Sequence, residues 1–265
     1  MFGRLTPLVK NLLIINVGIW AAQYLFKIDL GDRFGLFFIE SEHFNPVQFV
    51  TYMFLHSLTS PMHIFGNMFA LFIFGPLLEQ FLGQKKFLIL YMVTGVGAGL
   101  FYTGVNYIEV SAIRSQVNSY LDNPNSEDFN QLIADHNIYK PEYIYPFIDA
   151  YSRNPNDPNL IGQSVQYARG LYSLFGDYPM VGASGAIFGI LAAFALFFPN
   201  TELFLLFIPF PIKAKYLVTV YILYEVYAEL QRAPGDNVAH LAHLGGALIA
   251  FFLVRFWKAQ RSDFY

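Results

Sequence analysis

Long apolar stretches separated by short polar segments occupy both ends of the chain. A helix needs about 20 mostly apolar residues to cross a bilayer, and four uncharged stretches reach or approach that length: Ser57 to Leu78, Phe87 to Ile108, Tyr178 to Thr201 and Val238 to Val254. A shorter stretch, Asn11 to Phe26, follows two basic residues, Arg4 and Lys10. Because it lacks the small-residue cleavage site of a signal peptide, we expect it to be a retained first helix.

A sixth candidate, Ala214 to Gln231, is interrupted by Glu225 and Glu229, so apolar pattern alone does not decide whether it spans. The basic residues favour it, because cytoplasmic loops carry an excess of Lys and Arg. With six helices and a cytoplasmic N-terminus, the short inside segments hold Arg4, Lys10, Lys85, Lys86, Lys213, Lys215, Lys258 and Arg261, and the short outside loops hold Lys27, Arg33 and Arg232. Without this helix, Lys258 and Arg261 would lie on the wrong side.

A polar region, residues 106–177, separates the third and fourth apolar stretches. It contains DNPNSEDFNQ and SRNPNDPNL, which are too polar to enter lipid. Its tyrosines and short amphipathic pieces predict a partly helical extramembrane insert. We therefore place helices one to three within residues 1–105, the insert within 106–177 and helices four to six within 178–265. Another outside segment, Phe34 to Leu55, has an interfacial composition.

Composition agrees with a membrane protein. Charged residues make up 13% and hydrophobic residues 55% of the 265-residue chain, and mean hydropathy is +0.40. Soluble domains are about 25% charged, so an ordinary soluble enzyme is excluded. A net charge of −3 and no basic run longer than Lys85-Lys86 predict no nucleic-acid partner. Because the chain has no cysteine, thiol nucleophiles and thiolate metal sites are excluded. The predicted fold is an all-α membrane protein with six transmembrane helices and an extramembrane insert.

Hydrogen-bonding side chains inside a membrane are costly and usually mark a functional site. The second, fourth and sixth predicted helices run in the same direction, so positions equally far from their starts lie at equal depth. Asn67 follows Pro61 by six residues, Ser184 follows Pro179 by five, and His243 follows Asn237 by six. At 1.5 Å per residue, all three lie roughly 8 to 9 Å below the outer face. His63 lies one turn above Asn67.

This polar layer contains the groups that nucleophilic catalysis requires. A serine becomes a useful nucleophile only when a base takes its proton, and histidine suits that task near pH 7. Ser184 and His243 supply this pair. The developing oxyanion needs hydrogen-bond donors, which His63, Asn67 and the Ser184 backbone N–H can provide. No Asp or Glu occurs at this depth on the three helices, so we expect a Ser-His dyad.

Small residues surround both catalytic candidates. Gly185 and Gly189 form one small-xxx-small face, and Gly246 and Ala250 form another. Such faces let helix backbones approach closely, so we expect the fourth and sixth helices to pack there. Phe188 lies one turn below Ser184, where its ring can stack on the imidazole.

Taken singly, each of these residues has an ordinary structural explanation, such as helix packing for the GxSG tetrapeptide or interhelical hydrogen bonding for His63 and Asn67. We expect structural roles for His240 and Glu79, a loop or interfacial position for His56, and a protein or water environment for Glu225 and Glu229. A zinc site of His63, His240 and His243 is disfavoured, because no HExxH or HxxxH spacing accompanies them and we expect no carboxylate nearby; no metal or cofactor is predicted. The joint occurrence at one depth carries the functional prediction.

Four segments together resemble the rhomboid family of intramembrane serine proteases. They appear in the family's order and are HIFGN (His63 to Asn67), GPLLEQFLG (Gly75 to Gly83), GASG around Ser184 and AHLGG around His243. The resemblance implies that Ser184 is the nucleophile and His243 the general base. It further implies an oxyanion hole of His63, Asn67 and the Ser184 N–H.

The resemblance also bears on the supporting residues. Gly246 matches the family's glycine after the base, which favours His243 over His240. Phe188 replaces the Tyr of some relatives, and stacking survives that change. The predicted supporting residues are Phe188, Gly185, Gly246 and Glu79. The long insert departs from a minimal rhomboid, and we hypothesise that it contributes to substrate recruitment or gating.

The expected function is hydrolysis of peptide bonds in or near the transmembrane segments of membrane proteins, through an acyl-enzyme. The weakly apolar fifth helix is the candidate lateral gate. Two alternatives are a non-proteolytic protein that binds transmembrane helices and a transporter or channel. We expect a bacterial inner-membrane location with cytoplasmic termini and a periplasmic insert.

Overall fold

The computed structural model describes residues 5–136, 141–176, 178–204, 210–231 and 238–260, and most of these are helical. The six principal helices of the apolar regions are α1 (Pro7–Phe26), α4 (Pro61–Leu82), α5 (Gln84–Asp122), α9 (Ser184–Phe197), α10 (Ala214–Gln231) and α11 (His240–Ala259). Between α1 and α4 lie α2 (Gly31–Phe34), α3 (Gln48–Thr51) and the 3-10 helix η1 (Tyr52–Phe54). The insert forms α6 (Ser126–His136), α7 (Pro141–Arg153) and α8 (Pro158–Gly176), and an antiparallel pair, β1 (Glu202–Leu203) and β2 (Ile212–Lys213), precedes α10.

The chain is an all-α membrane protein. Within the described residues, four helices are long and apolar enough to cross a bilayer: α1, α4, α5 and α11. Helix α9 is apolar but has only 14 residues, and α10 has 18 residues with two glutamates. These two helices correspond to the predicted fourth and fifth spans, and the count of six spans stays a prediction. Of the residues used to predict orientation, Arg4, Arg232 and Arg261 lie outside the described ranges.

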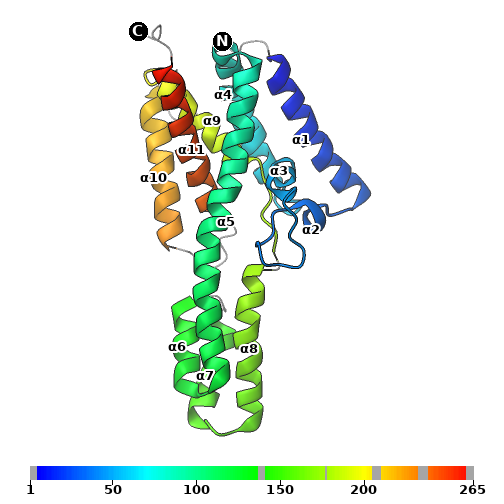
Figure 1. Cartoon of the computed structure of the whole chain (residues 1–265), viewed down its shortest axis with the longest axis vertical. Coiled ribbons are helices and arrows are strands. Elements are labelled where there is room, and N and C mark those ends of the chain that lie inside the picture. The colour runs from blue at the N-terminus through cyan, green and yellow to red at the C-terminus, as the bar shows by residue number, and fades with distance from the viewer. Residues whose placement is uncertain (1–4, 137–140, 177, 205–209, 232–237, 261–265) are drawn as a thin grey trace.

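Helix α5 continues far beyond the apolar region. Its 39 residues correspond to about 58 Å, about twice the thickness of a bilayer's hydrocarbon core, and it passes the predicted boundary at residue 106 without a break. Helices α6, α7 and α8 surround its C-terminal half, at the end of the molecule opposite the start of α1 and the end of α11 (Figure 1). Phe129 and Tyr151 are fully buried there in a separate apolar core. The insert is therefore a small helical bundle built on α5.

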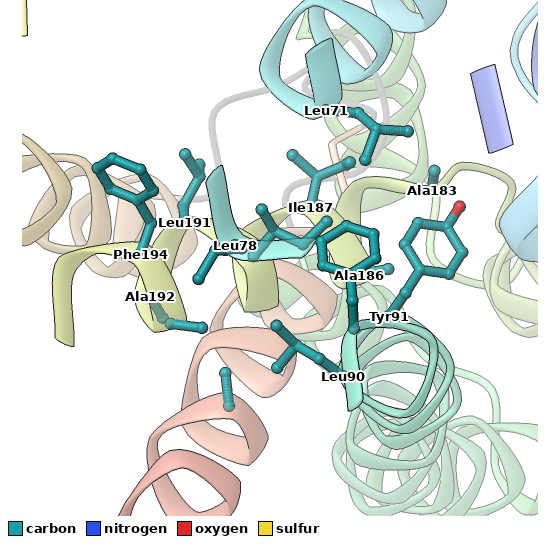
Figure 2. Packing of buried hydrophobic residues seen from close by; sticks show 14 of the residues in the cluster. Leu71, Leu78, Leu90, Tyr91, Ala183, Ala186, Ile187, Leu191, Ala192 and Phe194 are labelled. Carbon is teal, nitrogen blue, oxygen red and sulfur yellow. The ribbon is translucent and has the colours of Figure 1, made fainter. Parts of the chain in front are cut away.

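The apolar region packs around α9. Every residue from Gly185 to Phe194 is buried, which explains why this helix is apolar on all sides. Figure 2 shows Leu71 and Leu78 of α4, and Leu90 and Tyr91 of α5, packed with Ala186 and Ile187 of α9. Because α9 is the central helix, its neighbours fix the position of its first residue, Ser184.

Glycines set how closely α9 approaches its neighbours. A Cβ atom added at Gly246 of α11 would lie 1.9 Å from the Gly185 carbonyl oxygen, so the two backbones are in direct contact. The predicted approach of these two helices is therefore present. Gly189, by contrast, faces α5, because an added Cβ would lie 2.4 Å from Thr94. The small residues of α9 thus serve two interfaces and not one.

Glu79, near the C-terminal end of α4, joins this helix to the start of α1. Its buried carboxylate accepts hydrogen bonds from the backbone N–H groups of Leu8 at 3.1 Å and Val9 at 2.8 Å, and from the Thr6 hydroxyl. The first N–H groups of a helix have no partner within the helix, and a negative charge there also favours the helix dipole. Glu79 therefore fixes the position of α1 against α4.

Replacing Glu79 by Ala removes all three of these hydrogen bonds and leaves buried N–H groups without a partner, which costs on the order of 1–3 kcal/mol each. We expect a clear fall in the thermal unfolding temperature in detergent. Glu202→Ala, which removes an exposed carboxylate, is the control and should leave the unfolding temperature unchanged. Equal unfolding temperatures for the two variants would contradict the capping role.

Replacing Gly246 by Ala forces α9 and α11 apart, because the new methyl group overlaps the Gly185 carbonyl. Overpacking costs typically about 1–3 kcal/mol, and we expect a loss at the upper end of that range. Gly104→Ala is the matched control, since nothing lies within 4 Å of an added Cβ there and Ala favours a helix interior. Unfolding curves of both variants test the contact; equal stability of Gly246→Ala and wild type would refute it.

Candidate active site

Ser184 is the first residue of α9. The sequence predicted a span starting at Tyr178, with Ser184 more than a turn inside it, and that part of the prediction is wrong. The preceding segment is extended: Met180 pairs with Leu36 in an antiparallel bridge, and the Gly182 N–H donates to the Tyr52 carbonyl at 3.0 Å. Gly182 has a φ of +137°, which glycine adopts readily. This segment brings Ser184 to the start of a helix.

The start of α9 provides backbone donors. The Ile187 N–H makes a helical hydrogen bond to the Ala183 carbonyl at 3.0 Å, so the N–H groups of Ser184, Gly185 and Ala186 precede the helical ladder. Such N–H groups, together with the helix dipole, favour negative charge at a helix N-terminus. The Ser184 N–H therefore has the setting expected of an oxyanion donor.

His243 lies beside Ser184 across the close contact of α9 and α11. Gly185 packs on Gly246, and a Cβ added at Gly185 would lie 3.4 Å from the carbonyl of Ala242, the residue before His243. The predicted stacking is present: the Phe188 and His243 rings have centroids 4.3 Å apart and an interplanar angle of 8°. His243 is buried and Ser184 is half-buried. Within the described chain, no side-chain hydrogen bond links Ser184 Oγ to His243.

His63 of α4 reaches the same point from a third helix. Its Nδ1 accepts a long hydrogen bond, 3.5 Å, from the Ser57 N–H, which assigns the ring proton to Nε2. A Cβ added at Gly182 would lie 2.7 Å from His63 Nε2 and 3.5 Å from Ser184 Oγ. Gly182 thus lies between the two side chains.

Asn67 lies one turn further along α4 and is buried. Its Nδ2 atom is buried and has no hydrogen-bond partner among the residues that the structure describes. Buried polar atoms nearly always have partners in folded proteins, so a buried donor without one needs an explanation. One explanation is that this donor stabilises a negative charge that forms only during a reaction.

Glu225 of α10 is a member of the site that the sequence pattern did not predict. The carboxylate is buried, and its Oε2 lies 2.8 Å from Nδ1 of His243 and 2.6 Å from Nδ1 of His240. We predicted no carboxylate beside His243 because we compared depths on three helices only. Glu225 lies on a fourth helix, α10. The signal that could have indicated its role was its charge, because charged residues are rare in apolar helices.

The same three residues form the one group of potential metal ligands identified among the described residues, with ligand atoms within 4.8 Å of one another. Two atoms bound to one tetrahedral zinc, each about 2.1 Å from the metal, lie roughly 3.4 Å apart. The contacts of Glu225 with His243 and His240, at 2.8 and 2.6 Å, are shorter. As arranged, these contacts are hydrogen bonds. His63, which the zinc alternative included, is not part of the group.

His56 lies in the loop before α4, as predicted, and it is buried. Its ring contacts the His63 ring edge to face, with centroids 5.2 Å apart. Both of its ring nitrogens are buried without a hydrogen-bond partner in the described ranges. Burial, and secondarily the nearby His63, lowers the pKa of His56 from 6.5 to about 3. His56 is therefore a neutral packing partner of His63 at physiological pH.

The described residues form a polytopic membrane protein in which Ser184, His63 and His243 lie at or near the starts of α9, α4 and α11, with Asn67 one turn further along α4. The Rhomboid domain model matches residues 43–110 and 160–259. The chain belongs to the rhomboid family. The match passes over residues 111–159, which contain α6 and α7.

Two curated relatives carry rhomboid names. The chloroplastic rhomboid-like protein 11 of Arabidopsis thaliana is 35% identical over 91 residues, which cover 34% of this chain and 30% of that protein. An uncharacterized mitochondrial rhomboid protein of Schizosaccharomyces pombe is 27% identical over 212 residues, covering 75% of this chain and 48% of that protein. The chain thus spans less than half the length of either relative.

His56 predicts how stability depends on pH. Because the pKa of this imidazole is about 3 in the folded protein, against 6.5 for an unperturbed histidine, the unfolded chain binds more protons between these values. Stability therefore rises with pH across that window. We expect His56→Leu to reduce the rise in unfolding temperature between pH 4 and pH 7. The exposed His43→Leu should keep the wild-type slope; an unchanged slope in His56→Leu would contradict the assignment.

Proposed function

We propose that this protein is an intramembrane serine endopeptidase with Ser184 as nucleophile and His243 as general base. The observation that carries the proposal is the backbone contact of Gly185 with Gly246, which sets the Ser184 and His243 ends of two helices side by side. Phe188 stacked on the imidazole supports it. Rhomboid proteins are generally serine proteases, although some rhomboid-like members are inactive. The presence of both a nucleophile and a base supports activity here.

The reaction follows from these groups. His243 Nε2 takes the proton of the Ser184 hydroxyl as the oxygen attacks the scissile carbonyl, and the resulting imidazolium then protonates the leaving amine. Water hydrolyses the acyl-enzyme by the same proton transfers in the second half. The tetrahedral oxyanion receives hydrogen bonds from the Ser184 N–H, His63 Nε2–H and Asn67 Nδ2. The proposed chemistry uses no metal or cofactor.

The proposed partners are membrane proteins within the lipid bilayer, with no nucleic acid. Rhomboid proteins act on membrane-protein substrates there, and a peptide bond in a helix has its backbone groups hydrogen-bonded within the segment. A substrate segment must therefore unwind locally to present its carbonyl to Ser184. The insert remains a candidate for substrate recruitment, since α5 carries it on the side of the molecule where α4, α9 and α11 begin.

The proposed topology has both termini on the cytoplasmic side and the insert on the opposite side. Figure 1 supports the relative arrangement, because the start of α1 and the end of α11 lie at the end opposite the insert. The bacterial inner membrane stays a prediction from the sequence. The two relatives have chloroplastic and mitochondrial names, so they do not support it.

The alternatives gain less support. A transport path would need polar side chains to continue toward the inner face, but after Asn67 helix α4 reads MFALFIF. A protein that only binds transmembrane helices would not require both Ser184 and His243. Gating by α10 stays a hypothesis. For α10 to open, the hydrogen bonds between Glu225 and the two histidines of α11 would have to break, or α11 would have to move together with α10.

Cleavage of a model transmembrane substrate in proteoliposomes tests the proposal. We expect Ser184→Ala and His243→Ala each to lower kcat by at least about a thousandfold, because neither alone can activate the attack. Ser119→Ala, an exposed serine on α5, is the control and should retain wild-type rates. Cleavage by Ser184→Ala at the wild-type rate, or no cleavage by the wild type across several transmembrane substrates, would overturn the proposal.

A further inference from the structure

We infer that Glu225 is a positioning residue for His243, so that the site operates as a Ser-His-Glu triad with a second imidazole, His240, on the same carboxylate oxygen. This inference rests on the proposed serine-protease function. It goes beyond the predicted dyad, because the carboxylate comes from α10, outside the helices that carry the nucleophile, the base and the oxyanion donors.

The hydrogen bonds fix the tautomer of His243. An ionised carboxylate has no proton to donate, so the proton in the 2.8 Å contact between Glu225 Oε2 and His243 Nδ1 belongs to the imidazole. The other ring nitrogen, Nε2, then carries a lone pair, which a general base requires. The orienting role of an acid on Nδ1 is the same as in soluble serine proteases.

Glu225 also lies where it stabilises the charged state of the base. When His243 accepts the Ser184 proton, a positive imidazolium forms beside the negative carboxylate. Glu225 and His243 are both buried, with side chains 3% and 11% exposed, so water screens the attraction little. A buried carboxylate is costly unless it is paired and hydrogen-bonded, and two imidazole donors satisfy that requirement.

His240 moderates this effect. Its Nδ1 lies 2.6 Å from the same Oε2 atom, so its N–H donates to the oxygen that serves His243. A second donor draws negative charge from that oxygen and also restricts the Glu225 side chain to one orientation. The structure therefore assigns His240 a tuning role within the site.

Phe188 completes the restraint on the imidazole. It stacks on one face of His243 and contacts Tyr221 of α10, with ring centroids 4.8 Å apart. The base is thus held by an aromatic face of α9 and by the hydrogen bond that it donates to the Glu225 carboxylate of α10. Helix α10 contributes to the orientation of His243 although it carries none of the reacting atoms.

The test compares the steady-state kinetics of purified wild type, Glu225→Gln, Glu225→Asp and Glu229→Gln on one transmembrane substrate. The Gln variant keeps the shape but lacks the charge, and we expect kcat to fall about a hundredfold or more with KM nearly unchanged. The Asp variant retains a carboxylate and should recover part of that loss. Glu229→Gln, which removes the same charge one turn along α10, is the matched control.

The pH dependence of kcat/KM gives a readout that a purely structural role would not move. The titratable groups around His243 are Glu225 and Tyr221 of α10, His240 of α11 and His63 of α4. Loss of the Glu225 charge disfavours the imidazolium, so the acid limb of the profile should move to lower pH in Glu225→Gln. In His240→Leu the carboxylate keeps its full charge for His243, and the acid limb should move to higher pH.

The outcomes separate this inference from the proposed function. Wild-type kcat and an unshifted pH profile in Glu225→Gln, with Ser184→Ala inactive, would overturn the triad and leave the protease intact. An inactive wild type would overturn both. The unfolding temperature of every variant shows whether that variant is folded. If Glu225→Gln is unfolded, the activity of Glu225→Asp becomes the test. A Glu225→Asp activity no higher than that of a folded His243→Ala would contradict the inference.

Discussion

The direct contact between the backbones of α9 and α11 is the constraint on which the site depends. Gly246 leaves no room for a side chain against the Gly185 carbonyl, and this approach places the Ser184 and His243 ends of the helices together. Lipid offers little hydrophobic drive for helix association, so close packing of small residues has to supply it. The same feature thus stabilises the bundle and assembles the proposed catalytic pair.

Charged groups in the apolar region are few, and two buried carboxylates each join two helices. Glu79 of α4 binds the start of α1, and Glu225 of α10 binds two imidazoles of α11. Both carboxylates accept hydrogen bonds from two or more donors, as a buried charge requires. One of these connections serves packing, while the other reaches the proposed general base. The chemistry of the partner, rather than the carboxylate itself, distinguishes the two roles.

Much of this arrangement was predictable from the sequence, because apolar length and motif order depend on local residues. The positions of α1, α4, α10 and α11, and the Phe188 stacking on His243, agree with that expectation. The start of α9 was not predictable from hydropathy, since Tyr178 to Ala183 is apolar enough for a helix but is held in an extended form by Leu36 and Tyr52. Glu225 was missed because depth was compared on the second, fourth and sixth helices alone, and hydrophobic pattern does not encode which helices meet.

The most direct measurement is identification of the residue that reacts with a fluorophosphonate probe, by mass spectrometry of peptides from the purified protein in detergent. We predict a single phosphonylated peptide that contains Ser184, with labelling lost in His243→Ala, because only a serine activated by a base reacts readily. Labelling of another serine, or equal labelling of Ser184 in wild type and His243→Ala, would contradict it.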